Sequence, residues 1–320
     1  MIVVTGAAGF IASGLVGTLN KMGIEDIVIV DDFTQTRKIR NWETKKYVTK
    51  VQREDFFDWF DANATKIDFI FHLGARTDTT EFNWDVFQHL NFDYTRNIWT
   101  RCCDNNIPLI YASSAATYGD GEYGYIDDHN IVSSLKPLNP YGKSKNEFDL
   151  WALAQEKQPP FWVGTKFFNV YGPNEYHKGR MASVVLHTFE TVKKTGKMQL
   201  FRSHNPKFED GMQLRDFIYV KDVINILIHM YKTRPESGLY NVGTGNAESF
   251  LELATSTFIA MGKPVNIEFV DMPEDIRDKY QYFTEADTTK LRKTYNLPMH
   301  TLREGVADYV KNYLIPNCYL

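Results

Sequence analysis

The fold of this chain is decided by its first residues, Ile2-Val3-Val4-Thr5-Gly6-Ala7-Ala8-Gly9-Phe10-Ile11-Ala12. The apolar run Ile2-Val3-Val4 predicts a short buried strand, and the segment that follows predicts a helix to about Met22, with Gly23 as its C-terminal stop. Between strand and helix stands the pattern Gly6-x-x-Gly9-x-x-Ala12. Its small residues allow a tight turn from a strand into the N-terminus of a helix.

Further apolar runs with the same character recur along the first half of the chain. They are Ile27–Val30, Phe69–Leu73, Leu109–Ala112 and Trp162–Phe167. Continuous apolar strands separated by segments of helix length are typical of a parallel sheet that is covered on both faces. The sequence therefore predicts a doubly wound α/β fold.

The amino-acid composition changes after Tyr171, where loops rich in Gly, Pro and Asn begin. Helices are expected near Ala182–Lys194, Phe250–Ala260 and Leu302–Tyr313, and Asp216–Val220 and Leu239–Val242 are expected as strands that return to the main domain. We expect residues 1–168 plus about 215–246 to form a dinucleotide-binding domain. Residues of about 169–214 plus 247–320 are expected to form a smaller, interleaved substrate-binding domain.

Composition limits the classes of protein that need to be considered. The 320 residues carry a net charge of -4, which argues against a general nucleic-acid binder. No apolar run approaches the length of a membrane span, and no secretory signal is visible at the N-terminus. Cys102, Cys103 and Cys318 form no disulfide framework and lack metal-ligand spacing, so we expect no metal and a cytoplasmic location.

The glycine pattern at the first turn is typical of dinucleotide binding. Glycines let the backbone approach a pyrophosphate, and the unpaired amides of a helix N-terminus favour the anion. The alternative is a small-residue turn in an ordinary strand–helix unit. Asp31, at the end of the second strand, suits an adenosine ribose and favours NAD, whereas Arg37, Lys38 and Arg40 suit the 2′-phosphate of NADP or form a solvated basic loop.

A second candidate site is the pair Tyr141 and Lys145, four residues apart and therefore on one face of a helix. A nearby ammonium favours the phenolate, so the pair is suited to taking a proton from a substrate hydroxyl. The upstream serines Ser113 and Ser114 offer a hydroxyl for the developing carbonyl oxygen. The alternative is an exposed helix that carries Tyr and Lys by chance.

Several motifs in the same order resemble the extended short-chain dehydrogenase/reductases that act on nucleotide sugars. They are Gly6-x-x-Gly9, Ser113–Gly119, Tyr141-x-x-x-Lys145, Phe168–Pro173 and Arg215–Val223, and together they span nearly the whole chain. The resemblance implies a Rossmann fold and a tightly held nicotinamide cofactor. It further implies that Ser114 supplies the hydroxyl, Tyr141 is the acid/base and Lys145 binds the ribose, with Ser113 the less suitable serine.

Within that group, three segments resemble the ADP-glyceromanno-heptose 6-epimerases: Tyr111–Gly119, His177–Ser183 and Tyr280–Asp287. This resemblance implies an ADP-heptose substrate whose carbon 6 is inverted through a ketone, with Lys178 as a second acid/base. It also implies a role in lipopolysaccharide core biosynthesis, a homo-oligomer, and NADP as cofactor with NAD as the alternative. Lys178 would need a lowered pKa to act as a base, and the alternative is that it holds a substrate phosphate or the cofactor.

The resemblance also implies two further sets of site residues. For the cofactor these are Gly6, Gly9, Phe10, Ile11, Asp31, Asp32, Lys38, Arg53, Leu73, Gly74, Ala75, Arg76, Thr77, Asn91, Lys145, Val170 and Lys178. For the sugar nucleotide they are Ser114, Asn169, Arg180, His187, Phe201, Arg202, Ser203, His204, Arg215 and Tyr280. Structural readings stay open for Asn169 as a turn residue, His187 as a helix-packing residue and Tyr280 as core.

The chain departs from the pattern at two places. Residues 204–213 form a longer loop than expected, and Arg76-Thr77 replace small polar residues. Other functions therefore stay open: a related nucleotide-sugar epimerase, a 4,6-dehydratase, or a non-catalytic dinucleotide sensor. A dehydratase would place acidic residues beside the serine, where Ala115-Ala116-Thr117 stand, and a sensor would not need the tyrosine and lysine.

Overall fold

The computed structural model describes residues 1–277 and 281–320. Within them, seven parallel strands form one sheet in the order β11-β6-β5-β4-β1-β2-β3. The strands are β1 (Ile2–Thr5), β2 (Ile27–Asp31), β3 (Thr49–Gln52), β4 (Phe69–His72), β5 (Leu109–Ser114), β6 (Trp162–Phe167) and β11 (Gly238–Val242). The predicted doubly wound α/β fold is confirmed, including the strands expected from the apolar runs.

The strand order reverses between β1 and β4, which lie side by side from Ile2↔Phe69 to Thr5↔His72. In doubly wound sheets, ligands bind outside the carboxyl ends of the strands at such a reversal. The glycine pattern follows β1 and the segment Leu73–Thr77 follows β4, so both predicted cofactor segments leave the sheet at this point.

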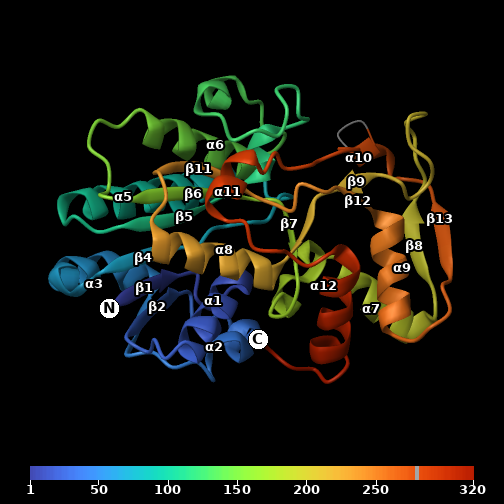
Figure 1. The fold of residues 1–320 in the computed structure, drawn as a ribbon, viewed down its shortest axis with the longest axis horizontal. Helices are drawn as coiled ribbons and strands as arrows, with labels where there is room; N and C mark the ends of the chain where they lie inside the picture. Colours follow the sequence, from blue (N-terminus) through green and yellow to red (C-terminus); the bar gives the residue numbers. More distant parts are fainter. Residues whose placement is uncertain (278–280) are drawn as a thin grey trace.

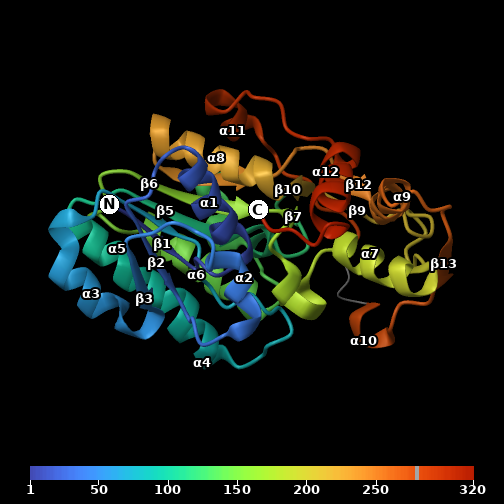
Figure 2. The ribbon, with the colours of Figure 1, turned by 90° about the horizontal axis from the view of Figure 1, so that it is seen from below.

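Helices cover both faces of the sheet, as Figure 2 shows. One face, with Val4 and Ile29, packs on α1 (Phe10–Lys21) and α8 (Val220–Thr233). The other, with Val3 and Val28, packs on α3 (Phe56–Asn63), α5 (Tyr94–Asp104) and α6 (Pro140–Leu153). Each large apolar side chain buried in this way stabilises the fold by ~1.5–3 kcal/mol, so the sheet is a rigid base for the turns at its edge.

A second group of elements lies beside the sheet, on the right in Figure 1. It contains α7 (Val184–Thr195), β8 (Met198–Phe201), β9 (Leu214–Arg215), β12 (Glu248–Ser249), α9 (Phe250–Ala260), β13 (Ile267–Val270), α10 (Glu274–Arg277) and α12 (Leu302–Tyr309). The parallel pair β8–β13 and the antiparallel pair β9–β12 join segments that lie far apart in the sequence. We propose that these elements form the interleaved substrate-binding domain. Leu291 of α11 (Thr289–Thr294) falls within the predicted range of that domain but packs in the core beside the sheet.

One predicted strand does not join the main sheet. β10 (Phe217–Tyr219) pairs in parallel with β7 (Asn169–Tyr171) instead, while β11 occupies the sheet edge beside β6. The strand expected at Asp216–Val220 is thus present as β10, outside the seven-stranded sheet. The backbone groups of β10 are satisfied by β7, which immediately follows β6, because β11 already covers that edge.

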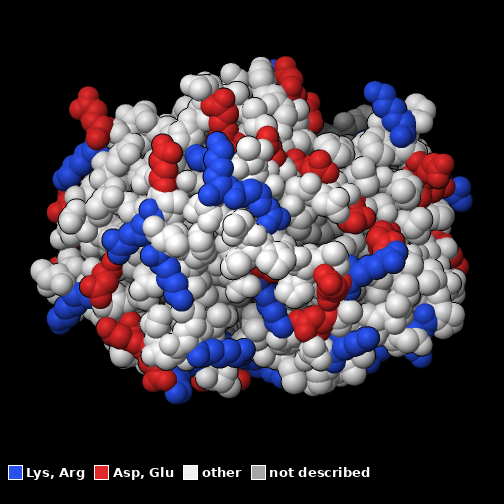
Figure 3. Space-filling view, viewed as in Figure 1, with Lys and Arg blue, Asp and Glu red and all other residues white. Residues whose placement is uncertain are grey.

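Two short helices, α2 (Ile39–Trp42) and α4 (Trp84–Phe87), complete the regular α-helices in the described ranges. None of the helices in these ranges has the length and apolar character needed to cross a membrane. On the face seen in Figure 3, acidic and basic side chains are interspersed.

Candidate active site

The turn between β1 and α1 is shaped by close contact with the loop after β4. Gly6 has φ +69, and a Cβ there would lie 2.6 Å from the Cα of Gly74. A Cβ at Gly9 would lie 2.8 Å from the Gly6 carbonyl oxygen. Gly9 caps α1 without a side-chain hydrogen bond, and the first turn has no acidic residue, so this helix N-terminus is suited to an anion.

A cavity of about 470 Å³ opens at this turn. Most of the predicted cofactor residues line it: Gly6, Gly9, Phe10, Ile11, Asp31, Lys38, Arg53, Leu73, Gly74, Ala75, Arg76, Thr77 and Lys178. The glycine cradle and the helix N-terminus fit a dinucleotide, and the Nε of Arg76 is a buried donor without a hydrogen-bond partner in the structure. The residues present therefore fit the cofactor that the sequence predicts.

Asp31 is paired with a lysine in the cavity. Its carboxylate accepts hydrogen bonds from the Ala8 amide at 3.0 Å and from Lys38 Nζ at 3.0 Å. Arg37 and Arg53 also line the cavity. The acid that suggested NAD is thus already paired with a cation, and the cavity holds two further guanidinium groups.

Four predicted cofactor residues do not line the cavity: Asp32, Asn91, Lys145 and Val170. Asp32 accepts hydrogen bonds from Thr34 and Gln35, and the Thr34 hydroxyl is the main cause of its lowered pKa. Val170 packs against the core. Lys145 donates instead to the Ala112 carbonyl of β5.

Asn91 has a clear supporting role. It is 1% exposed, accepts from the Arg76 amide at 2.8 Å and donates to the Arg76 carbonyl at 3.0 Å. Its amide also donates to Ser144 Oγ at 3.0 Å. Asn91 therefore ties the loop after β4 to the helix that carries Tyr141.

Ser114 and Tyr141 meet where β5 ends and α6 begins. Asn139 caps α6 by accepting from the Gly142 amide, and Pro140 occupies the first helical position. The side chains of Tyr141 and Ser114 are hydrogen bonded. Burial raises the pKa of Tyr141 and this hydrogen bond opposes the rise, so the lowered phenol pKa that we expected from the Tyr141–Lys145 spacing is not found.

Lys145 lies one turn further along α6. Its Nζ donates to the Ala112 carbonyl at 2.8 Å, and burial lowers its pKa to about 8. The lysine bonds to β5 because a buried ammonium requires an acceptor. Its side chain is 4% exposed.

A buried charge network lies behind these residues, and the spacing of Tyr141 and Lys145 did not predict it. Asp149 accepts from Ser113 Oγ at 2.6 Å, from Tyr111 at 2.9 Å and from Lys166 at 2.7 Å. Lys166 donates also to Thr117 at 2.8 Å. Asp149 stands four residues after Lys145, on the same face of the helix, and that spacing was the available signal.

Ser113 belongs to this network and Ser114 to the pair with Tyr141. Successive residues of a strand point to opposite faces, so the two serines have separate environments. The preference for Ser114 over Ser113 as the hydroxyl near the tyrosine agrees with this geometry.

Lys178 lies on a 3₁₀ segment, Tyr176–Met181, in which Gly179 has φ +55. Its Nζ is 5.3 Å from the centre of the Phe10 ring and it lines the cavity. Burial lowers its pKa and Glu175 opposes that shift. Ser114, Tyr141 and Lys145 are not among the residues that line this cavity, so the structure places Lys178 and Tyr141 in different surroundings.

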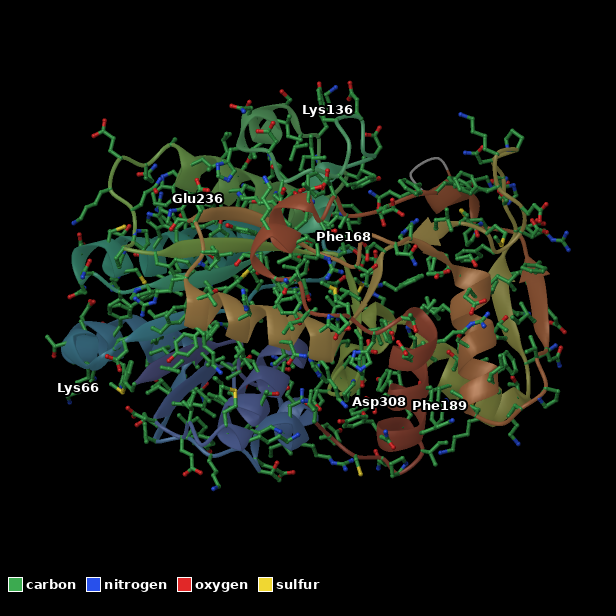
Figure 4. The ribbon with its side chains drawn as sticks, viewed as in Figure 1. Lys66, Lys136, Phe168, Phe189, Glu236 and Asp308 are labelled. Atoms are coloured by element: carbon green, nitrogen blue, oxygen red, sulfur yellow. The ribbon has the colours of Figure 1, made fainter. Side chains whose placement is uncertain are left out.

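The predicted substrate residues fall into two groups. Arg180 is near Lys178 and pairs with Asp78 at 3.4 Å, while His187 approaches the Arg180 carbonyl at 3.4 Å. Asn169 is exposed on β7, directly after Phe168, which Figure 4 labels. Of these three, Arg180 lines the cavity.

The other group surrounds the longer loop. Phe201 ends β8, and Arg202, Ser203 and His204 follow it. The Ser203 amide donates to Asp210 at 2.8 Å, the His204 amide to Tyr282 at 3.2 Å, and Arg202 lies 3.8 Å from Asp210. Tyr280 lies outside the described residues.

Gln281 connects this second group with the turn after Ser114. Arg215, 8% exposed, donates to the Gln281 carbonyl, and the Gln281 side chain donates to the Gly119 carbonyl. Gln281 was part of the motif that carried the resemblance but was not predicted as a site residue. Its position within the motif Tyr280–Asp287 was the signal that could have identified it as a site residue.

Comparisons with known proteins agree over almost the whole chain. Residues 2–243 match the NAD dependent epimerase/dehydratase family. An ADP-L-glycero-D-manno-heptose-6-epimerase of Fusobacterium nucleatum is 48% identical, and one of Nitratidesulfovibrio vulgaris is 44% identical, each covering 98% of both chains. The crystal structure of a Helicobacter pylori ADP-L-glycero-D-manno-heptose-6-epimerase has a TM-score of 0.79 and 27% identity, and the match covers 97% of this chain and 95% of that one. The chain therefore belongs to the NAD dependent epimerase/dehydratase family.

Proposed function

We propose that this protein is an isomerase that inverts carbon 6 of ADP-D-glycero-D-manno-heptose to give the L-glycero form. The observation that carries the proposal is full-length similarity to proteins named for this activity. The residues that the chemistry needs are also present, with Ser114 hydrogen bonded to Tyr141 and Lys178 lining the cavity.

In this proposal the bound nicotinamide nucleotide supplies a hydride acceptor and donor. Tyr141, in its phenolate form, takes the proton of the carbon-6 hydroxyl as the ketone forms, and the Ser114 hydroxyl donates to the ketone oxygen. Lys178 returns a proton when the opposite face of the ketone has been reduced. Exchange with solvent then removes the proton from Tyr141 and restores the one on Lys178, so both groups recover their starting forms. Burial lowers the pKa of Lys178, which is the direction that a lysine needs to exchange protons near neutral pH.

The proton must be handled in two poses of the carbonyl, and that requirement explains a second acid/base. A single fixed group reaches the oxygen well in one pose only, since proton transfer requires heavy atoms within about 3 Å. Lys178 lies on a segment separate from α6, which suits it to the second pose. Arg180, near Lys178, offers a guanidinium for the diphosphate of the substrate.

We propose NADP as the nucleotide. The support is the pairing of Asp31 with Lys38 and the presence of Arg37 and Arg53 in the lining of the same cavity. An extra phosphate dianion at the adenosine ribose is favoured by such a cluster of cations. Lys38→Ala should reduce the preference for NADP over NAD by about tenfold, roughly 1.4 kcal/mol.

The activity is tested by incubating the purified protein with ADP-D-glycero-D-manno-heptose and following carbon 6 by proton NMR. Conversion to the L-glycero form is expected. No change at carbon 6, with inversion of a different sugar nucleotide in the same assay, would assign the chain to another epimerase. Denaturing the purified protein and identifying the released nucleotide decides between NADP and NAD.

A further inference from the structure

One buried carboxylate holds both ends of the segment that carries Lys178. Glu175 is 0% exposed. One of its oxygens accepts from the Gly172 amide at 3.2 Å and from Ser183 Oγ at 2.6 Å, and the other accepts from the Ser183 amide at 2.6 Å. Lys178 stands between these two anchor points, so a single side chain determines the path of residues 172–183.

The backbone of this segment needs such an anchor. Gly172 has φ +141 and Gly179 has φ +55, and the helical part, Tyr176–Met181, is a short 3₁₀ run. A run of this kind has few internal hydrogen bonds. The Lys178 amide donates to the Glu175 carbonyl at 2.9 Å, so Glu175 also starts the turn on which Lys178 lies.

Lys178 and Glu175 also influence each other electrostatically. Burial raises the pKa of Glu175, and the Ser183 hydroxyl and then Lys178 oppose that rise. Burial lowers the pKa of Lys178, and Glu175 opposes the shift. Asp149, by comparison, has Lys166 as a hydrogen-bonded cation. Glu175 accepts instead from the Gly172 and Ser183 amides and from the Ser183 hydroxyl, and the Tyr309 phenol lies beside it.

Other titratable groups around the pair keep one charge state near neutral pH. Tyr309 of α12 and Tyr176 adjoin Glu175, and burial raises the pKa of both phenols. His177 has its pKa lowered to about 4 by burial and by nearby cations, Lys38 first. Asp78 and Arg180, which also line the cavity, form an ion pair, and the Thr80 hydroxyl is the main cause of the lowered pKa of Asp78.

We propose that Glu175 is a positioning residue for Lys178, which holds the lysine segment in place and favours the ammonium form of Lys178 in the cavity. Its catalytic meaning rests on the proposed function, in which Lys178 is the second acid/base. The carboxylate opposes the effect of burial on Lys178 and so favours a proton on its amine. Lys178 is then able to donate in one direction of the reaction and accept in the other.

The test is a direct measurement of the charge state of Lys178 in the full-length protein. With lysine labelled at ¹³Cε, the Lys178 resonance is identified by its absence from Lys178→Arg and titrated with pH. In Glu175→Gln, which keeps a hydrogen-bond acceptor but removes the charge, we expect the pKa of Lys178 to fall by about one unit or more. Glu190→Gln, an exposed residue on α7, removes the same charge from the surface and should leave the Lys178 titration unchanged.

Glu175→Asp should restore part of the shift, because it restores the charge. The limb of the kcat profile that depends on Lys178 should move to lower pH by the same amount as its titration. An unchanged Lys178 titration in folded Glu175→Gln overturns the proposal. If Glu175→Gln does not fold, Lys178→Met provides the reciprocal test, since removing the cation should raise the pKa of Glu175, and an unchanged Glu175 titration overturns it equally.

The titration also separates this inference from the proposed function. A shifted Lys178 pKa in a protein without 6-epimerase activity would support the coupling and refute the function. Normal 6-epimerase activity with an unshifted Lys178 pKa would support the function and refute the coupling.

Discussion

The two lysines of the site are positioned in different ways. Lys145 belongs to the Tyr141 cluster (Ser114, Tyr141 and Lys145), which is built on a regular strand and a capped helix. Lys178 belongs to the Lys178 segment (residues 172–183), which is irregular and contains two glycines with positive φ. A buried carboxylate opposes the effect of burial on the pKa of each lysine, Asp149 for Lys145 and Glu175 for Lys178.

The carboxylates differ in what they bind, and the difference follows from the backbone. The helix and the strand satisfy their own amides, so Asp149 accepts only from side chains, including the ammonium of Lys166. The Lys178 segment leaves amides unpaired, and Glu175 accepts from two of them. A regular element thus allows a buried acid to be neutralised locally, whereas an irregular one uses the acid as part of its backbone structure.

The largest expected effect tests whether both regions carry out chemistry. Tyr141→Phe and Lys178→Met should each lower kcat for carbon-6 inversion by about 10²–10⁴-fold, because each removes a positioned acid/base. The proton NMR assay measures the rate, and the nucleotide released on denaturation shows that the cofactor is retained. Full activity in Lys178→Met would leave the Tyr141 cluster as the only acid/base.

Removal of the carboxylate behind the Tyr141 cluster should mainly destabilise the fold. Asp149→Asn leaves the ammonium of Lys166, which is 1% exposed, without its counter-charge, at a cost of about 3–5 kcal/mol in the free energy of unfolding. Urea denaturation measures this loss. Adding Lys166→Met should recover part of it because no buried charge then remains unpaired, and a double variant less stable than the single one would contradict this account.

The pH dependence of the free energy of unfolding reports how far the Tyr141 cluster is shielded from water. Burial lowers the pKa of Lys145 to about 8, against about 10.4 in an unfolded chain. Between these values the unfolded chain binds more protons, so the contribution of Lys145 to the free energy of unfolding rises with pH, by up to about 3 kcal/mol. Urea denaturation at both ends of this window should show a smaller rise in Lys145→Met than in the parent, and parallel rises would mean that Lys145 is solvated.

The sequence predicted the parts of the site whose geometry follows from local spacing. Gly6 and Gly9 specify a turn because of their missing Cβ atoms, and the predicted loop after β4 lines the same cavity. Glu175 and Asp149 were not predicted, because their roles depend on partners brought close by the fold. The pKa of Tyr141 was predicted in the wrong direction because spacing gives the neighbouring charge but not the burial, which has the larger effect here.

The same limit applies to the pairing of β10. Its apolar pattern correctly predicted a strand, but the choice of partner depends on which sheet edge is already occupied, and β11 occupies it. Asn91 is a similar case, since its amide supports the cofactor loop from behind. Sequence patterns indicate that a residue belongs to a site more readily than they show which atoms it contacts.

The smallest expected effect separates support from chemistry within the Tyr141 cluster. Ser113 donates to Asp149 and Ser114 is hydrogen bonded to Tyr141. Ser113→Ala should lower the free energy of unfolding by about 1.5–3 kcal/mol, the usual value for a hydrogen bond to a charged group, and leave kcat within about twofold. Ser114→Ala should lower kcat by about 10²-fold, as expected for a lost donor to a developing oxyanion. Urea denaturation and the NMR assay on both variants would show this division, and a loss of kcat in Ser113→Ala equal to that in Ser114→Ala would mean that the Asp149 network takes part in the reaction itself.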